Sequence, residues 1–173
     1  MTVERPIRAA VLGTGSWGTT FSVVLADAGC EVTLWGRRAE VVDQLRTEHR
    51  NDAYLPGHDL PVEIAATTDA RAALAGADVV AIAVPAQNAR SVLEPLRDVF
   101  PAHAVAVSLM KGIELSTDRR MSEVIVEALG IPESHVAVIS GPNLAHEIIE
   151  RQPTATVVAS VNDESAHLVA RAS

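Results

Sequence analysis

The alternation of short apolar runs with longer amphipathic stretches constrains the fold of this chain more than any other feature. Apolar runs of strand length recur at Ala9–Leu12, Val32–Trp35, Val79–Val84, Ala104–Ser108, Val136–Ser140 and Thr156–Ala159. Apolar residues spaced by three and four, which is typical of helices, lie between them in Trp17–Ala28, Ala39–Thr47, Asn88–Val99 and Met121–Leu129. Nearly continuous apolar strands with intervening helices indicate a mostly parallel sheet with helices on both faces. The sequence predicts a doubly wound α/β fold.

The length of the chain predicts one domain. Its 173 residues, 48% of them hydrophobic, are enough for a single core, and no linker-like stretch divides residues 1–173. The segment Glu48–Pro61 is polar and rich in turn-forming residues, so we expect a long surface loop there. Residues Asn162–Ser173 have the pattern of a helix that is just beginning, which leads us to expect a second domain that is absent from this chain.

Composition excludes several classes of partner. A formal net charge of −8 argues against nucleic acid and anionic membranes, so a phosphate-bearing ligand needs a local cluster of positive groups. No stretch approaches the roughly 20 apolar residues that cross a bilayer, and Met1–Pro6 does not resemble a secretory signal. We therefore expect a cytoplasmic protein without membrane insertion. The single cysteine, Cys30, fits a structural role, and the histidines show no metal-ligand spacing, so no metal is predicted.

A glycine-rich turn follows the first apolar run and opens the first helix. Residues 13–18 read Gly-Thr-Gly-Ser-Trp-Gly, the dinucleotide-binding fingerprint in its proper context. Gly13 permits a tight turn, Gly15 allows the backbone to approach a pyrophosphate closely, and Gly18 allows close packing of the helix. Ser16 adds a hydroxyl donor, whereas Trp17 either packs under the sheet or walls the cofactor site. The turn predicts a Rossmann-like nucleotide site; the alternative is a plain strand-to-helix connection.

The end of the second apolar run indicates which dinucleotide is preferred. NAD-specific sites place an acidic residue there, but this chain has Arg37 and Arg38. Guanidinium groups bind a 2′-phosphate in a bidentate manner, so NADP(H) is preferred and NAD(H) remains open. The alternative is that both arginines are solvated residues that start a helix.

Three later segments at strand ends carry further candidates. Val84-Pro85-Ala86 either walls the ligand site or only ends a strand. Lys111 is the only lysine among fourteen basic residues, and its ammonium could bind a substrate phosphate or polarise a carbonyl. An ordinary surface lysine is the alternative. Gly141 and Asn143 begin a segment that could bind an anion, although Asn143 could equally be a helix N-cap.

Four motifs taken together resemble the bacterial NAD(P)-dependent glycerol-3-phosphate dehydrogenases. They are residues 13–18, Tyr54-Leu55-Pro56-Gly57, Met110-Lys111-Gly112-Ile113-Glu114 and Ser140-Gly141-Pro142-Asn143-Leu144-Ala145, and they span nearly the whole chain. The resemblance implies reversible hydride transfer between dihydroxyacetone phosphate and sn-glycerol 3-phosphate, which supplies glycerophospholipid synthesis.

The resemblance also assigns roles. It implies cofactor contacts at the three glycines and at Ser16, Trp17, Arg37, Arg38, Tyr54, Lys111 and Ala145. It implies substrate contacts at Lys111, Gly141 and Asn143, of which Lys111 and Asn143 belong to the catalytic machinery. The resemblance also implies a helical C-terminal substrate domain, absent from this chain, that carries the proton-transfer lysine. Whether a homodimer forms through that domain stays open. Two alternatives are a non-catalytic NADP-sensing module and another two-domain NADP-dependent reductase.

Overall fold

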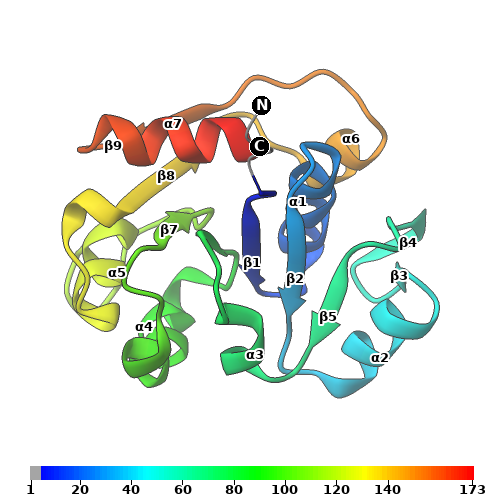
Figure 1. Cartoon of the computed structure of the whole chain (residues 1–173), viewed down its shortest axis with the longest axis horizontal. Coiled ribbons are helices and arrows are strands. Elements are labelled where there is room, and N and C mark those ends of the chain that lie inside the picture. Colours follow the sequence, from blue (N-terminus) through cyan, green and yellow to red (C-terminus); the bar gives the residue numbers. More distant parts are fainter. Residues whose placement is uncertain (1–4) are drawn as a thin grey trace.

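A seven-stranded sheet forms the centre of the computed structural model, which describes residues 5–173 (Figure 1). Its order is β5-β2-β1-β6-β7-β8-β9, and every neighbouring pair is parallel except β8 and β9. The strands are β1 (Arg8–Leu12), β2 (Glu31–Trp35), β5 (Ala65–Thr67), β6 (Val79–Ile82), β7 (Val105–Ser108), β8 (Val136–Ser140) and β9 (Val157–Ser160). The predicted doubly wound α/β fold is confirmed. Of the segment Met1–Pro6, residues 1–4 lie outside the described range.

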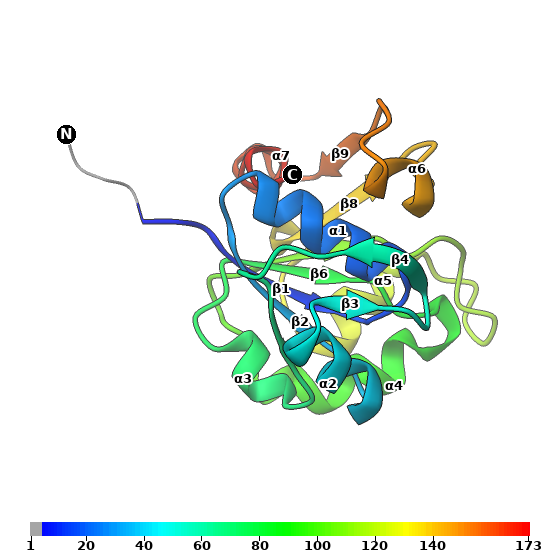
Figure 2. The ribbon, with the colours of Figure 1, turned by 90° about the vertical axis from the view of Figure 1, so that its right-hand side faces the viewer.

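Helices cover both faces of the sheet because successive strand residues point to opposite sides. Ala10, Leu12, Val80 and Ile82 pack with helices on one face; these are α3 (Ala70–Leu74), α4 (Ala89–Leu93) and α5 (Met121–Leu129). The other face carries α1 (Ser16–Asp27), α2 (Ala39–Thr47) and α7 (Asp163–Ala172). The short helix α6 (Ala145–Ile149) lies beside α1 (Figure 2). Among residues 5–173, no helix has the length and apolar character needed to span a bilayer.

Two expectations about local structure are wrong. Glu48–Pro61 is not simply a surface loop, since β3 (Arg50–Asn51) and β4 (Leu55–Asp59) form an antiparallel hairpin there. Asn51 and Leu55 are fully buried, and their burial pins this polar segment to the domain. The single helix expected at Asn88–Val99 is divided into a 3₁₀ turn η1 (Ala86–Asn88), α4 and a second 3₁₀ helix η2 (Glu94–Val99). Pro95 at the start of η2 has no backbone N–H to donate, which explains the break.

The direction of the chain changes between β1 and β6. After β1 the chain builds outward to β2 and β5, and it then returns to the other side of β1 to build β6, β7 and β8. Open α/β sheets bind ligands at the carboxyl ends of the strands at such a switch point. The topology therefore directs attention to the loops that follow β1, β2, β6 and β7.

Candidate functional site

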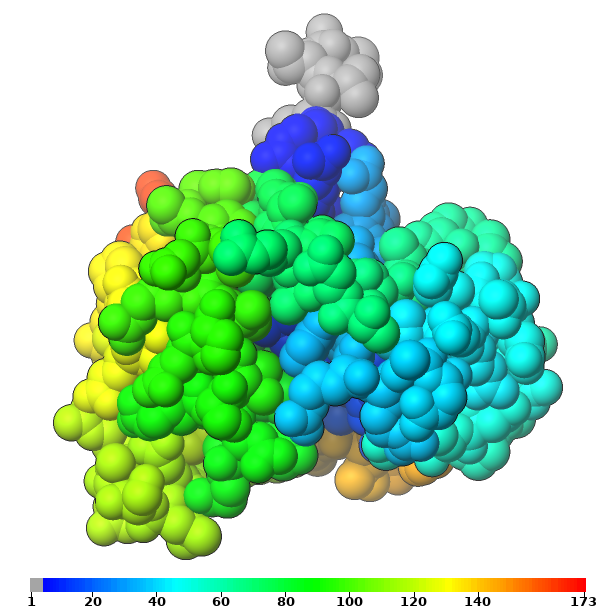
Figure 3. Space-filling model, turned by 90° about the horizontal axis from the view of Figure 1, so that it is seen from below, coloured from blue at the N-terminus to red at the C-terminus, as the bar shows by residue number. Residues whose placement is uncertain are grey.

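A cleft of about 440 Å³ lies at this switch point. The loops after β1, β2, β6 and β7 line it, together with one residue of the hairpin; the lining comprises Gly13–Trp17, Trp35–Arg38, Tyr54, Ala83–Ala86 and Leu109–Lys111. Figure 3 views the molecule from this side, where the blue segments of β1 and β2 meet the green segment that follows β6. The sheet thus brings together residues that are nearly a hundred positions apart in the sequence.

The glycine-rich turn presents backbone donors to the cleft. Gly13 donates its N–H to the carbonyl oxygen of Trp35 (2.9 Å), which ties the turn to the end of β2. Helix α1 then begins at Ser16, with Gly15 as its N-cap; no side chain caps this terminus and no acidic residue lies in its first turn. The first N–H groups of a helix have no intrahelical partner and carry partial positive charge. An ideal Cβ on Gly15 would meet no atom within 4 Å, so there is room for an anion at the donors.

Trp17 packs against the sheet and also lines the cleft. Its ring packs against Phe21 (centroids 5.7 Å apart) and against the core on that face of the sheet, and it also lines the cleft. The same holds for Val84-Pro85-Ala86, which forms a wall of the cleft while Pro85 caps η1. These residues therefore belong both to the packed interior and to the cleft wall.

Asn51 is the residue of this site that sequence reasoning missed. Its side-chain amide is fully buried and donates to the Thr14 carbonyl oxygen (2.9 Å) and to Thr19 Oγ1 (2.8 Å). It fastens the β3–β4 hairpin to the glycine-rich turn and to α1. The surrounding sequence is polar and contains prolines, which hides this role. Its signal of inward packing is the pair of apolar residues Leu55 and Leu60, both of which are buried in the structure.

We expect Asn51→Ala to lower the free energy of unfolding by about 1–3 kcal/mol, because it removes two buried hydrogen bonds and leaves the Thr14 carbonyl oxygen only the long contact from Thr19 Oγ1 (3.4 Å). Cofactor affinity should fall as well, since the turn loses its anchor. Gln44→Ala is the control: Gln44 binds Asp52 of the same hairpin through exposed bonds of 2.8 and 3.0 Å, and its loss should cost about 0.5 kcal/mol or less. Urea unfolding measures both variants, and equal losses would contradict the role of Asn51.

The two arginines after β2 have different environments. Arg38 donates from Nε to Glu40 Oε1 (2.7 Å) and from Nη1 to the Tyr54 hydroxyl (3.2 Å), and its guanidinium lies 5.8 Å from the centre of the Tyr54 ring. The hydrogen bond that Arg38 donates to Glu40 is the main reason that the pKa of Arg38 is raised. Arg37 is exposed and lines the cleft. Among the described residues, Arg38 forms an ion pair at this strand end and Arg37 forms none. Arg37 is therefore the freer guanidinium.

Lys111 connects the cleft to the second group of candidates. Its Nζ donates to the carbonyl oxygen of Gly141 (3.4 Å). Gly141 leaves no room for a side chain, because an ideal Cβ would lie 2.6 Å from the carbonyl oxygen of Ala155. The Asn143 amide donates to Thr156 Oγ1 (3.1 Å), whereas its Oδ1 is buried without a hydrogen-bond partner in the described structure. The Lys111–Gly141 contact therefore joins the loop after β7 to the segment that carries Asn143.

The N-cap interpretation of Asn143 is wrong, since Leu144 occupies the N-cap position of α6 and no side chain caps that helix. Ala145 lies outside the cleft lining; its carbonyl oxygen accepts a hydrogen bond from Thr20 Oγ1 of α1 (3.3 Å). Gly18 packs behind the turn, against the Gly13 carbonyl and Ala83. The remaining predicted cofactor residues line the cleft; they are Gly13, Gly15, Ser16, Trp17, Arg37, Arg38, Tyr54 and Lys111.

A glycine-rich turn at an uncapped helix terminus, set at the switch point of a parallel sheet, defines the class of Rossmann-type dinucleotide-binding domains. Residues 8–166 match the family described as NAD-dependent glycerol-3-phosphate dehydrogenase N-terminus, and the chain belongs to this family.

Similar proteins agree with this membership. A glycerol-3-phosphate dehydrogenase, NAD(P)+, of Streptomyces griseus is 54% identical over 164 residues, which is 95% of this chain and 49% of the relative. One of Thermobifida fusca is 53% identical over 160 residues, or 92% and 48%. The crystal structure of glycerol-3-phosphate dehydrogenase from Coxiella burnetii superimposes with a TM-score of 0.87 at 35% identity, covering 97% of this chain and 51% of that one. The chain spans about half the length of these relatives.

Proposed function

We propose that this chain is the cofactor-binding half of a glycerol-3-phosphate dehydrogenase. It binds NADP(H) in preference to NAD(H) and takes part in reversible hydride transfer between dihydroxyacetone phosphate and sn-glycerol 3-phosphate, for glycerophospholipid synthesis. The observation that carries the proposal is the uncapped N-terminus of α1, which opens into a cleft containing Arg37 and Lys111. Family membership and the names of the relatives support it.

The residues of the chain divide the work. Backbone N–H groups at the start of α1 bind the pyrophosphate, and Arg37 binds the 2′-phosphate. Val84–Ala86 and Trp17 exclude water from one wall of the cleft. Lys111, beside Gly141 and Asn143, orients the phosphorylated substrate and stabilises negative charge that develops on its oxygen. The nicotinamide, when bound, supplies or accepts the hydride.

The other half of the reaction machinery lies, in this proposal, beyond residue 173. A helical domain there supplies the proton-transfer lysine and much of the substrate pocket, and closure between the halves excludes water. We infer a cytoplasmic protein whose self-association would run through that second half. The cofactor half alone should then bind NADPH and turn over little substrate.

The cleft provides its own optical probe for the test. Trp17 and Trp35 are the only two tryptophans of the chain, and both line the cleft. Bound NADPH should quench their fluorescence and emit by energy transfer, in a saturable titration. NADPH oxidation with dihydroxyacetone phosphate, run on this chain and on the chain joined to a relative's second half, completes the test. Binding without turnover in both proteins would favour a nucleotide-sensing module and overturn the enzymatic proposal.

Arg37→Ala should weaken NADPH binding by about tenfold or more and leave NADH binding nearly unchanged. The lost interaction is a charge-assisted hydrogen bond to the 2′-phosphate, which NADH lacks, and such bonds contribute roughly 1.5–3 kcal/mol. Arg46→Ala is a matched control, since Arg46 is an exposed arginine on the neighbouring helix α2. Tryptophan quenching gives both dissociation constants. Equal losses for the two cofactors would refute the 2′-phosphate assignment.

A further inference from the structure

The loop between β7 and α5 carries Lys111, but the loop itself has little apolar anchorage. Met110, before the lysine, is buried in the core. Gly112, after it, has a φ of +116°, a conformation that residues with a side chain rarely adopt. Beyond this turn, Ile113 and Leu115 are 48% and 77% exposed. Hydrophobic packing therefore holds the lysine from one side only.

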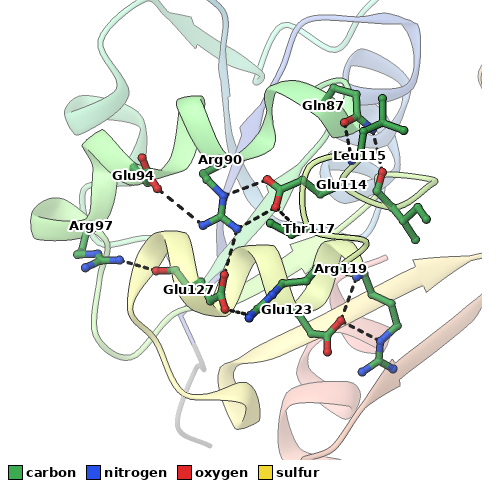
Figure 4. A network of polar contacts seen from close by, with 12 residues as sticks. Gln87, Arg90, Glu94, Arg97, Glu114, Leu115, Thr117, Arg119, Glu123 and Glu127 are labelled. Carbon is green, nitrogen blue, oxygen red and sulfur yellow. Dashed lines mark hydrogen bonds and ion pairs between the residues drawn. The ribbon is translucent and has the colours of Figure 1, made fainter.

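Polar contacts hold the other side. Gln87, in η1, donates from Nε2 to the carbonyl oxygen of Ile113 (2.8 Å) and accepts through Oε1 from the N–H of Leu115 (3.0 Å) (Figure 4). The Gln87 side-chain amide thus binds two backbone groups, and it connects the loop that follows β6 to the loop that follows β7. Gln87 comes directly after the cleft wall Val84–Ala86, so the wall and the lysine loop are joined at this point.

Arg90 makes the second attachment, one helical turn further on in α4. Its Nε and Nη2 bind the two carboxylate oxygens of Glu114 at 3.0 and 2.9 Å, a bidentate pair, and Nη2 also reaches Glu127 Oε2 of α5 (3.0 Å) (Figure 4). The Glu114 residue is only 7% exposed. The hydrogen bonds from Arg90 and then from Thr117 lower the pKa of Glu114 to about 2, so it remains ionised at neutral pH.

We propose that Gln87 and Arg90 are positioning residues that hold Lys111 at the cleft by gripping Ile113, Glu114 and Leu115. The inference rests on the proposed function, which places Lys111 at the cofactor and the substrate. Because Gln87 and Arg90 follow the cleft wall, their hydrogen bonds fix the position of the lysine relative to that wall as well as to its own strand. Glu114 acts through this grip and touches no ligand.

The single lysine makes this proposal directly measurable. Acylation by an N-hydroxysuccinimide ester, followed by mass spectrometry, reports the amine of Lys111 apart from the N-terminal amine. In the native chain Lys111 is exposed, and its ammonium donates to the Gly141 carbonyl oxygen (3.4 Å). This contact and bound NADPH should each slow the acylation. Glu114→Gln should accelerate acylation of the free chain by about fivefold, because the lysine loop is no longer held.

Matched variants separate positioning from general stability. Glu31→Gln removes a carboxylate that binds Arg8 (3.2 Å) at the start of β2, far from Ile113–Leu115, and should leave Lys111 acylation unchanged. Gln87→Ala leaves Glu114 intact and should accelerate acylation as Glu114→Gln does, which keeps the test available if one variant does not fold. Native acylation rates of Lys111 in the folded Gln87→Ala and Glu114→Gln variants would overturn the proposal. The proposed function fails separately, through absence of NADPH quenching in the unaltered chain.

Discussion

Gly15→Asp should weaken NADPH binding severely while leaving the domain as stable as the unaltered chain, or slightly more stable. Gly15 is the N-cap of α1 with φ −70° and ψ 176°, a conformation open to any residue, and an added Cβ meets no atom within 4 Å. Aspartate is a preferred N-cap, and its charge complements the helix dipole by roughly 0.3–1 kcal/mol. The same carboxylate occupies the place of the pyrophosphate, and opposing like charges costs several kcal/mol.

Two measurements test this opposition between stability and binding. Thermal unfolding should give an equal or higher Tm for Gly15→Asp, while tryptophan quenching should show NADPH affinity reduced by about 100-fold or more. Gly15→Ser caps the helix without a charge, so it should keep the stability and lose much less affinity. If the aspartate variant binds NADPH as tightly as the unaltered chain, the cofactor does not lie at this helix terminus.

The central part of the site is predictable from the sequence because local rules determine it. The turn at residues 13–18 couples conformation, helix start and anion binding within one short segment, and the apolar runs around it determine the sheet. Arg37 and Lys111 stand out because each follows a strand, and parallel strands bring their carboxyl ends to the same edge. Position relative to a strand was the informative signal in both cases.

The supports of the site escape prediction because they act between segments that are distant in the sequence. Asn51 contacts Thr14 from 37 residues away, and Arg90 contacts Glu114 from 24 residues away. Nothing in the local pattern of either residue distinguishes a buried tether from a solvated polar side chain. The β3–β4 hairpin was missed for a related reason: turn-forming residues dominate its sequence, while burial of Asn51 and Leu55 holds it in place.

Gly13→Ala should lower the free energy of unfolding by about 3–5 kcal/mol, because backbone strain and a steric collision add at this one position. The φ of Gly13 is +126°, which strains any residue with a side chain, and the added Cβ would lie 2.6 Å from the carbonyl oxygen of Ala83. That oxygen belongs to the backbone that continues from β6, so no side-chain rotation can relieve the collision. The turn would have to move away from β6, and the cleft would lose its shape.

Gly29→Ala isolates the first of these costs. Gly29 also has a positive φ, +86°, but an added Cβ there meets no atom within 4 Å. Its substitution should cost only about 1–2 kcal/mol and leave NADPH binding intact, because it lies at the far end of α1 from the cleft. Urea unfolding of the two variants therefore measures the collision by difference. Equal destabilisation would mean that strain alone matters, and that the contact between the turn and β6 does not shape the cleft.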